Sequence, residues 1–230
     1  PEYRPLVTAD ESKLVFTSRR EGASNGKKDV DGRNYEDIFV SEKDDLGYWK
    51  QPENISSNIN SELHEASVGL SPDGSELIIY KGNPDVGGLF ISKQVGTEWT
   101  APRMLGENVN SKKYHESSAS ISADGKFIFF VSNRKGTMGE KDIWKAEKEP
   151  AGEWGKAVNL GHTINTEFDE ESPFIHPDGK TLYFSSKGHS SMGGYDIFKT
   201  VNENGQWTKP ENIGYPVNTA GDDLHFVLTA

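Results

Sequence analysis

The chain has 230 residues, of which 25 are Lys or Arg and 36 are Asp or Glu, so its formal net charge is −11. An acidic surface repels polyphosphate, and we therefore expect no nucleic-acid partner. The chain contains no cysteine, which excludes disulfides, thiolate metal sites and a cysteine nucleophile. The longest apolar run, residues 127–131, is too short to span a membrane.

Short segments with alternating apolar and polar residues run through the whole chain and are separated by turn residues. The 24 Gly and 11 Pro residues are enough to end a segment every several positions. This pattern predicts short antiparallel strands and almost no helix. In the clearest stretch, 171–219, we expect strands at 172–175, 181–185 and 195–198 and a last strand that begins at Trp207.

Four repeats of this pattern follow one another in chain order. Their boundaries fall at 2–60, 61–110, 111–165 and 166–218, and residues 219–230 begin a further copy. A fixed spacing across copies identifies a repeat architecture, in which one unit cannot bury its sheet alone. Each repeat carries a tryptophan followed eleven residues later by an asparagine: Trp49 and Asn60, Trp99 and Asn110, Trp154 and Asn165, Trp207 and Asn218.

Within the repeats, strands with small residues precede strands with bulky ones. The strand before each Asp-Gly turn carries small residues such as Ser67 and Ser118, whereas the strand after the turn is bulky, as at 77–80 and 127–130. Innermost strands crowded round an axis need small side chains, and bulky second strands fill the space between neighbouring sheets. We expect the four tryptophans to add aromatic contacts between blades.

The predicted fold is all-β: a β-propeller of four-stranded antiparallel blades with four complete sequence repeats, which form a single domain over 1–230. Residues 224–230 repeat the pattern of residues 3–9, so a fifth, truncated blade is the alternative. The sequence opens at Pro1 inside a repeat, and we expect it to be a domain of a longer protein.

The repeat motifs resemble those of a known family. Ser-Pro-Asp-Gly at 71–74, Leu-x-Phe-x-Ser at 182–186 and Gly-Gly-x-Asp-Ile at 193–197 resemble the TolB-type, WD-repeat-like β-propeller repeat. With Trp-x-x-Pro-x-Asn-Ile-Gly at 207–214, the chain is similar to the propeller of OmpA-family envelope lipoproteins of the PorE type. The second repeat departs from the pattern, because Gly88 stands where the other repeats have Asp.

The resemblance implies a function as well as a fold. In that family the propeller lies between a helical repeat domain and a peptidoglycan-binding domain, and the best-known member serves the type IX secretion machinery by tying it to the cell wall. The resemblance therefore implies a periplasmic, outer-membrane-associated protein whose partners are envelope or secretion-machinery proteins. Peptidoglycan would be bound only through a domain outside this chain. No motif for a cofactor is found.

Acidic residues and histidines follow each Asn-Ser/Thr motif, at the entrance to the innermost strand. They are His64, Glu65, His115, Glu116, Asp169, Glu170, Asp222 and Asp223. If the repeats form a ring, these groups converge at one mouth of its channel, where they could bind a cation or the amines of a peptide. The alternative is a structural role, in which each carboxylate accepts hydrogen bonds from the neighbouring blade, and recurrence in every repeat favours it.

Three other patterns are weaker. Asp29, Asp31, Asn34 and Glu36 resemble a calcium loop, but the ligand spacing of the helix-loop-helix motif is incomplete. An ordinary hairpin is therefore favoured, and no metal site is predicted. Residues 22–26 match Gly-x-Ser-x-Gly but lack the strand-to-helix context of a hydrolase nucleophile. The His-Glu-x-x-His pattern of zinc hydrolases does not occur in the sequence.

Two functions follow from these patterns. The favoured one is a non-catalytic protein-interaction scaffold in the bacterial cell envelope, and the alternative is a glycan- or peptide-binding or processing propeller with a site in its central channel. A convergent set of unlike residues from different blades would favour the alternative, whereas the sequence shows like residues at repeated positions. Exposed aromatic residues in variable loops, such as Tyr48 and Tyr114, are the first candidates for a partner surface, and the alternative is that they cover blade edges.

Overall fold

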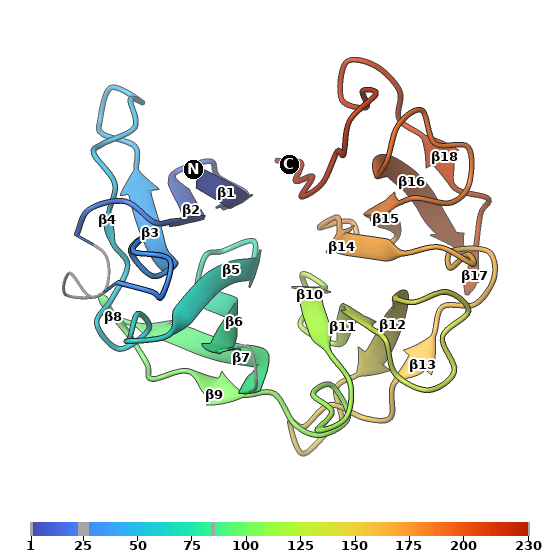
Figure 1. Cartoon of the computed structure of the whole chain (residues 1–230), viewed down its shortest axis with the longest axis horizontal. Helices are drawn as coiled ribbons and strands as arrows, with labels where there is room; N and C mark the ends of the chain where they lie inside the picture. The colour runs from blue at the N-terminus through green and yellow to red at the C-terminus, as the bar shows by residue number, and fades with distance from the viewer. Residues whose placement is uncertain (1, 23–27, 84–85, 230) are drawn as a thin grey trace. The chain divides into compact units, whose positions relative to one another are not determined.

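The computed structural model describes residues 2–22, 28–83 and 86–229. The chain divides into two compact units, which are Pro1–Met104 with Thr229–Ala230 (unit one) and Leu105–Leu228 (unit two). Each unit contains two antiparallel sheets, and the described residues form no helix (Figure 1). The predicted all-β fold with four antiparallel blades is confirmed. No described helix could therefore cross a membrane.

Unit one holds the first two blades. The first sheet has the order β1 (Glu2–Val7), β2 (Lys13–Ser18), β3 (Asp37–Glu42) and β4 (Glu53–Asn54). The second has β5 (His64–Leu70), β6 (Glu76–Asn83) and β7 (Val86–Val95) in order, with the short strands β8 (Glu98–Trp99) and β9 (Arg103–Met104) both paired to β7. Each blade is thus a meander of strands consecutive in sequence.

Unit two holds the third and fourth blades, built in the same way. The third sheet has the order β10 (Glu116–Ile121), β11 (Phe127–Ser132), β12 (Asp142–Glu147) and β13 (Val158–Asn159). The fourth has β14 (Glu170–Ile175), β15 (Thr181–Ser186) and β16 (Asp196–Glu203), with β17 (Gln206–Trp207) and β18 (Glu211–Asn212) both paired to β16.

The outermost strand of each blade differs from the prediction. The tryptophans do not begin that strand but lie in a short hairpin before it, either in β8 and β17 or in single bridges from Lys43 to Trp49 and from Lys148 to Trp154. The outermost strand follows a few residues later and is only two residues long in every blade. Alternation of apolar residues cannot identify a strand that short.

The core of each unit lies between its two sheets. In unit one, Val15 and Ile38 of the first blade pack with Leu77, Ile79 and Trp99 of the second. Bulky second strands therefore fill the space between neighbouring blades, as predicted. The corresponding cluster of unit two comprises Phe129, Val131, Ile143, Ile164, Ile175, Leu182, Phe184 and Phe198, with Trp207 packed against it.

The expected contribution of the four tryptophans holds for three of them. Trp99 and Trp154 are buried and Trp207 is half-buried. The backbone carbonyl of Trp99 also accepts a 2.7 Å hydrogen bond from Asn58 in the preceding repeat. Trp49, which belongs to the first repeat, is 43 % exposed. The expectation of a contact between blades is therefore not met at Trp49, whose ring instead lies 5.0 Å from the Lys43 ammonium group.

A bulge interrupts the pairing of every innermost strand with its neighbour. The register of β1 with β2 shifts between Tyr3 and Leu6, and that of β14 with β15 shifts between Glu171 and Phe174. At these bulges Arg4 and Ser172 each have a φ of 52°, which a residue with a side chain adopts only where the surrounding structure requires it. The bulge is therefore part of the repeat.

Candidate functional site

In the first, third and fourth repeats the final asparagine clamps the departing chain onto the third strand of its own blade, and in the second repeat Asn110 donates to the Leu105 carbonyl at 2.6 Å. The side chain of Asn60 accepts a hydrogen bond from the Ile38 N–H at 2.9 Å and donates one to the Ile38 carbonyl at 2.8 Å. Asn165 does the same with Ile143, and Asn218 with Ile197. A buried amide that satisfies a backbone donor and acceptor together has a structural role.

The glutamates at the predicted channel mouth are buried beside these clamps. Glu65, which has no exposed surface, accepts hydrogen bonds from the backbone N–H and hydroxyl of Ser61. Glu116 and Glu170 accept the equivalent backbone N–H bonds from Ser111 and Thr166. Each carboxylate therefore fixes the turn that leads from one blade into the next.

The compensation of these buried charges differs between repeats. Lys81 lies 3.0 Å from Glu65, and Arg134 lies 3.1 Å from Glu116. Glu170 accepts hydroxyl hydrogen bonds from Thr166 and Ser186, and no cation forms an ion pair with it among the described residues. Burial raises the pKa of Glu170 to about 7, although those hydrogen bonds oppose the shift.

The remaining predicted channel-mouth residues lie at the same turn. The carboxylate of Asp223 accepts the Thr219 N–H, and Asp222 accepts the Tyr195 N–H at 3.0 Å. The backbone N–H of His115 donates to the side chain of Asn133 at 2.8 Å. That the pairs of all four repeats line one common mouth stays a prediction.

In unit one, four unlike side chains converge beside this turn, and we call them the His64 cluster: Arg19, Asp29, Glu36 and His64. The Nε2 of His64 lies 3.2 Å from the Asp29 carboxylate, and its Nδ1 accepts the Glu36 N–H at 3.3 Å. Arg19 pairs with Glu36 at 3.2 Å. His64 comes from the second repeat and the other three come from the first, so the cluster joins two blades.

Aromatic rings border the His64 cluster. The ring of Tyr35 meets the ring of His64 edge to face, with centroids 4.9 Å apart. Burial, followed by a hydrogen bond with Glu36, raises the pKa of Tyr3. Tyr3 therefore stays protonated and can serve as a hydrogen-bond donor at neutral pH.

The predicted calcium-like loop is part of this cluster. Asp29 and Glu36 face His64, and Asp31 pairs with Arg19 at 3.1 Å. Asn34 donates hydrogen bonds to the carbonyls of Arg19 and Arg20. The loop oxygens thus face cationic and N–H groups, and no set of three or more His, Asp or Glu side chains in the described part of the chain could hold a metal ion.

A cleft of the first repeat lies beside the cluster. Its volume is about 450 Å³, and it is lined by basic side chains that include Arg19, Arg20, Lys28 and Arg33. The Gly-x-Ser-x-Gly match at 22–26 falls almost entirely on residues 23–27, which lie outside the described residues. Glu2 also lines this open cleft and pairs with Arg20 at 3.0 Å, and Arg19 pairs with Asp31 and Glu36, so these two arginines already have anionic partners.

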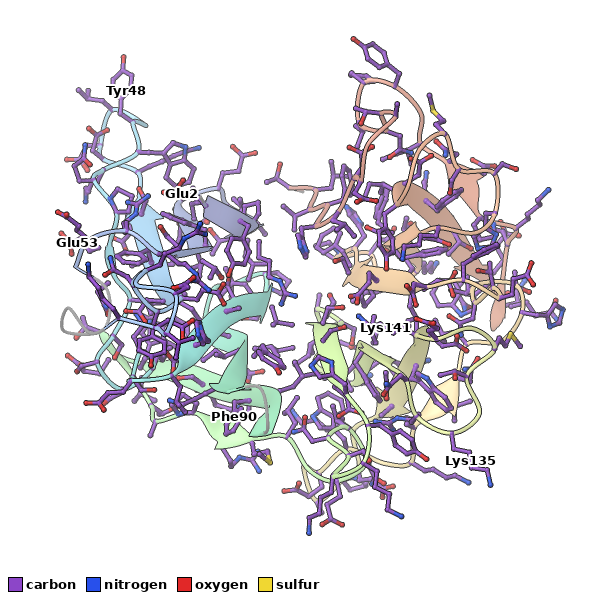
Figure 2. The ribbon with its side chains drawn as sticks, viewed as in Figure 1. Glu2, Tyr48, Glu53, Phe90, Lys135 and Lys141 are labelled. Carbon is purple, nitrogen blue, oxygen red and sulfur yellow. The ribbon has the colours of Figure 1, made fainter. Side chains whose placement is uncertain are left out.

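Unit two has a second convergent set at the equivalent blade junction, which we call the Glu171 cluster: Lys141, Asp169, Glu171, Lys187 and Tyr195. Lys141 pairs with Glu171 at 2.7 Å, and Lys187 pairs with Asp169 at 2.8 Å. The Tyr195 hydroxyl donates to Asp169 at 3.2 Å. Burial, together with the charge of Asp169, raises the pKa of Tyr195 to about 12. Figure 2 labels Lys141.

Sequence reasoning missed four members of these clusters, which are Arg19, Lys141, Lys187 and Tyr195. Alignment of the repeats could have identified two of them, Lys141 and Tyr195, by the position directly before the Asp-Ile pair. Glu36, Lys141 and Tyr195 each stand directly before the Asp-Ile pair that begins a third strand. A position that carries an acid, a base and a phenol in otherwise similar repeats is a candidate for a site specific to each repeat.

Exposed apolar side chains gather on one hairpin of unit one. The hairpin after β3 carries Leu46, Tyr48 and Trp49, and Tyr48 is 71 % exposed. Figure 2 shows Tyr48 projecting from the end of this hairpin. Tyr114, the other aromatic residue predicted for a partner surface, is only 38 % exposed. The hairpin is therefore the stronger candidate of the two.

Comparison with known proteins bears on the fold. No family model and no curated relative matches the chain. TolB from Acinetobacter baumannii has a similar structure, with a TM-score of 0.60 and 16% identity over 92% of this chain and 43% of that one. A protein assigned as TolB from Agrobacterium tumefaciens gives a TM-score of 0.51 and 15% identity over 96% of this chain and 85% of that one.

A puromycin-hydrolyzing peptidase from Mycobacterium tuberculosis is also similar, with a TM-score of 0.53 and 10% identity over 94% of this chain and 30% of that one. The chain spans less than half the length of the Acinetobacter structure and of the peptidase. Together with the four antiparallel blades, these similarities define the class of protein as a β-propeller. Within that class the fold is TolB-like.

Proposed function

We propose that this chain is a non-catalytic protein-interaction scaffold of the bacterial cell envelope. It acts in the periplasm, associated with the outer membrane through the longer protein to which it belongs, as in OmpA-family lipoproteins of the type IX secretion machinery. Its partners are envelope or secretion-machinery proteins, and peptidoglycan is bound only by a domain outside this chain. The TolB-like fold supports the proposal at the level of architecture.

The main support for the proposal is that the repeated carboxylates are buried and hydrogen-bonded to the chain itself. Glu65, Glu116 and Glu170 are buried and satisfied by the turns they hold, so they stiffen the array instead of facing a substrate. The two ring nitrogens of His64 are likewise engaged by Asp29 and Glu36. A histidine with both nitrogens occupied is poorly placed to act as a general base. Rigid blades that carry variable loops are suited to binding other proteins.

The exposed hairpin of unit one provides the test. Envelope extract is passed over the immobilised chain, and the retained proteins are identified. A variant with Leu46→Ser and Tyr48→Ser should lose most of a defined set of envelope proteins, because aromatic residues commonly dominate interface energies. The matched control is Val158→Ser, which removes an exposed apolar side chain from β13. Equal retention by both variants would remove the hairpin as the partner surface.

The His64 cluster favours a second candidate, a glycan- or peptide-binding propeller. It is a convergent set of unlike residues from two blades, and a basic cleft lies beside it. The test is titration of the chain with soluble peptidoglycan fragments and with acidic and basic peptide pools, in parallel with His64→Ala. Two results together would favour this candidate over the scaffold. The chain would bind one of these ligands saturably and His64→Ala would abolish that binding, and the immobilised chain would retain no envelope protein.

A further inference from the structure

Two lysines occupy the same position in the third strands of unit two. Lys145 lies in β12 and Lys199 lies in β16, and each is the fourth residue of a strand that begins with Asp-Ile. In unit one the equivalent residues are apolar: Val40 packs against the core between the two blades, and Ile91 is buried. An ammonium ion at a position with such surroundings is unusual.

The two lysines differ in their neighbours across the sheet. Lys145 lies opposite Phe129 of β11 and Val158 of β13, which are both apolar. On the side of the outermost strand, Lys199 instead lies opposite Glu211 of β18. Directly opposite residues share one face of a sheet, so their side chains are neighbours. Lys145 therefore has apolar neighbours on both sides, whereas Lys199 has a carboxylate on one side.

The amine of Lys145 lies against aromatic rings. Its Nζ is 3.7 Å from the ring centroid of Phe127 and 5.8 Å from that of Phe129. The fourth blade has Thr181 at the position of Phe127. Lys145 is half-buried, and no carboxylate forms an ion pair with it in the described part of the chain. Its ammonium group therefore loses water without gaining an anionic partner.

These surroundings favour the uncharged form of the amine. Burial lowers the pKa of Lys145, and the charges of Glu147 and Asp124 oppose the shift. Asp124 is itself paired with Lys126 at 3.5 Å. The face of an aromatic ring also attracts an ammonium ion, but this attraction is weak at a partly exposed site. A larger share of Lys145 than of an exposed lysine is therefore the uncharged amine, which is the nucleophilic form.

We propose that Lys145 is a selective acylation site that reacts with activated acyl donors of the acyl phosphate class. The uncharged Nζ attacks the carbonyl carbon of the donor, and a new N–C bond forms. The bond from that carbon to the phosphate oxygen breaks, the phosphate leaves with the electron pair, and one proton passes from the nitrogen to water. The acylated side chain is neutral, so it suits the apolar neighbours Phe129 and Val158 better than an ammonium group does.

The test treats the whole chain with a limiting amount of acetyl phosphate at about pH 8 and follows acetylation of each lysine by peptide mass spectrometry. Lys145 should react about fivefold faster than Lys199, because more of it is uncharged. Lys199 is half-buried as well, so it serves as an internal control for access of the reagent. Phe127→Thr gives Lys145 the neighbour that the fourth blade has, and it should bring the two rates within about twofold of each other.

Val158→Glu is the second variant, and it leaves the core intact because Val158 is 63 % exposed. It places a carboxylate where the fourth blade has Glu211, so it should slow the reaction at Lys145 and leave that at Lys199 unchanged. Equal rates at the two lysines of the parent chain would overturn the proposal. A faster reaction at Lys145 in Phe127→Thr would also overturn it, because the ring would then hold the amine in its charged form.

Discussion

The His64 cluster of unit one and the Glu171 cluster of unit two occupy equivalent blade junctions but carry differently charged side chains at equivalent positions. Glu36 and Lys141 stand at the same repeat position, and so do His64 and Asp169. The first junction pairs an acid with an imidazole across two blades, whereas the second places a lysine beside two acids. The backbone bond beneath them is the same in both units, at 2.8 Å and 2.9 Å.

Each repeat contains residues that hold the turn between blades and one position whose side chain varies. Asn60 and Asn165, with Glu65 and Glu170, hold the turn in both units through bonds to the backbone. The charge of the side chain one position before the Asp-Ile pair can therefore differ between repeats without moving the turn. Rigid turns with one variable position provide different surfaces on one architecture.

The largest expected effect comes from removing the clamp. Asn165→Ala should lower the free energy of unfolding by about 3 kcal/mol, because it leaves the buried N–H of Ile143 without a partner and removes one of the two bonds to the Ile143 carbonyl, which keeps the Leu160 N–H at 3.2 Å. Asn60→Ala should cost less, about 2 kcal/mol, since Asn165 makes an additional 2.8 Å bond to Asn159. Urea unfolding of both variants measures the difference. Equal losses would show that the additional bond contributes nothing.

The second prediction concerns pH. The pKa of Glu170 is about 7 in the folded chain against 4.5 for the free side chain, so between these values the folded state holds more protons than the unfolded state. Stability therefore falls as pH rises from 4.5 to 7, by roughly 3 kcal/mol in total. Glu170→Gln should remove this fall, and the variant should exceed the parent in stability at pH 8.

Glu65→Gln is the matched control in unit one. It leaves Lys81 without its partner at 3.0 Å, so it should lower stability at pH 5 and at pH 8 alike. Urea midpoints at the two pH values measure both variants. If Glu170→Gln kept the slope of the parent, burial of Glu170 would not be the source of the pH dependence.

A third, smaller effect tests the charge reversal itself. Lys141→Met should cost about 1 kcal/mol, because Glu171 keeps its hydrogen bonds to Ser117 and Ser118 but loses its cation. Glu36→Gln in unit one should cost less than this, since Arg19 keeps its 3.1 Å pairing with Asp31. Both losses should shrink in 1 M NaCl. Losses that do not change with salt would point to packing instead of charge.

The smallest effect lies in the first turn of unit one. Glu11 has a φ of 56° where the other repeats place Gly74, Gly125 and Gly179. Glu11→Gly should stabilise the chain by about 0.5–1 kcal/mol, because a residue with a Cβ is strained there. Gly125→Ala in unit two should have the opposite sign and a similar size. Thermal unfolding measures both variants. A loss of stability in Glu11→Gly would show that the 3.4 Å contact of Glu11 with Lys43 stabilises the chain by more than the backbone strain costs.

The sequence was sufficient to predict the blades because strand period, turn residues and repeat spacing agree with one another. It placed the asparagines correctly in the repeat but could not show that Asn60 and Asn165 clamp residues that lie far back in sequence. The two-residue outer strands escaped prediction because their pairing depends on the neighbouring strand and not on local pattern.

The sites were less accessible to sequence reasoning. His64 and Asp169 were identified as candidates, but Arg19 and Lys187, which pair within the clusters, lie at the ends of second strands. Such contacts join residues of different strands, and charge alone does not indicate which pairs meet. Trp49 occupies the same repeat position as Trp99 and Trp154, yet it is exposed and they are buried, so the repeat position alone does not determine burial.

The asparagine clamp has a consequence for how such arrays change over evolutionary time. Each clamp joins groups 21 or 22 residues apart, for example Asn60 with Ile38 and Asn218 with Ile197. A duplication or deletion of one repeat length, which is 50, 55 or 53 residues between successive tryptophans, therefore regenerates an intact clamp wherever it begins. Unequal recombination can change the number of blades in one step without leaving an unpaired end inside the array.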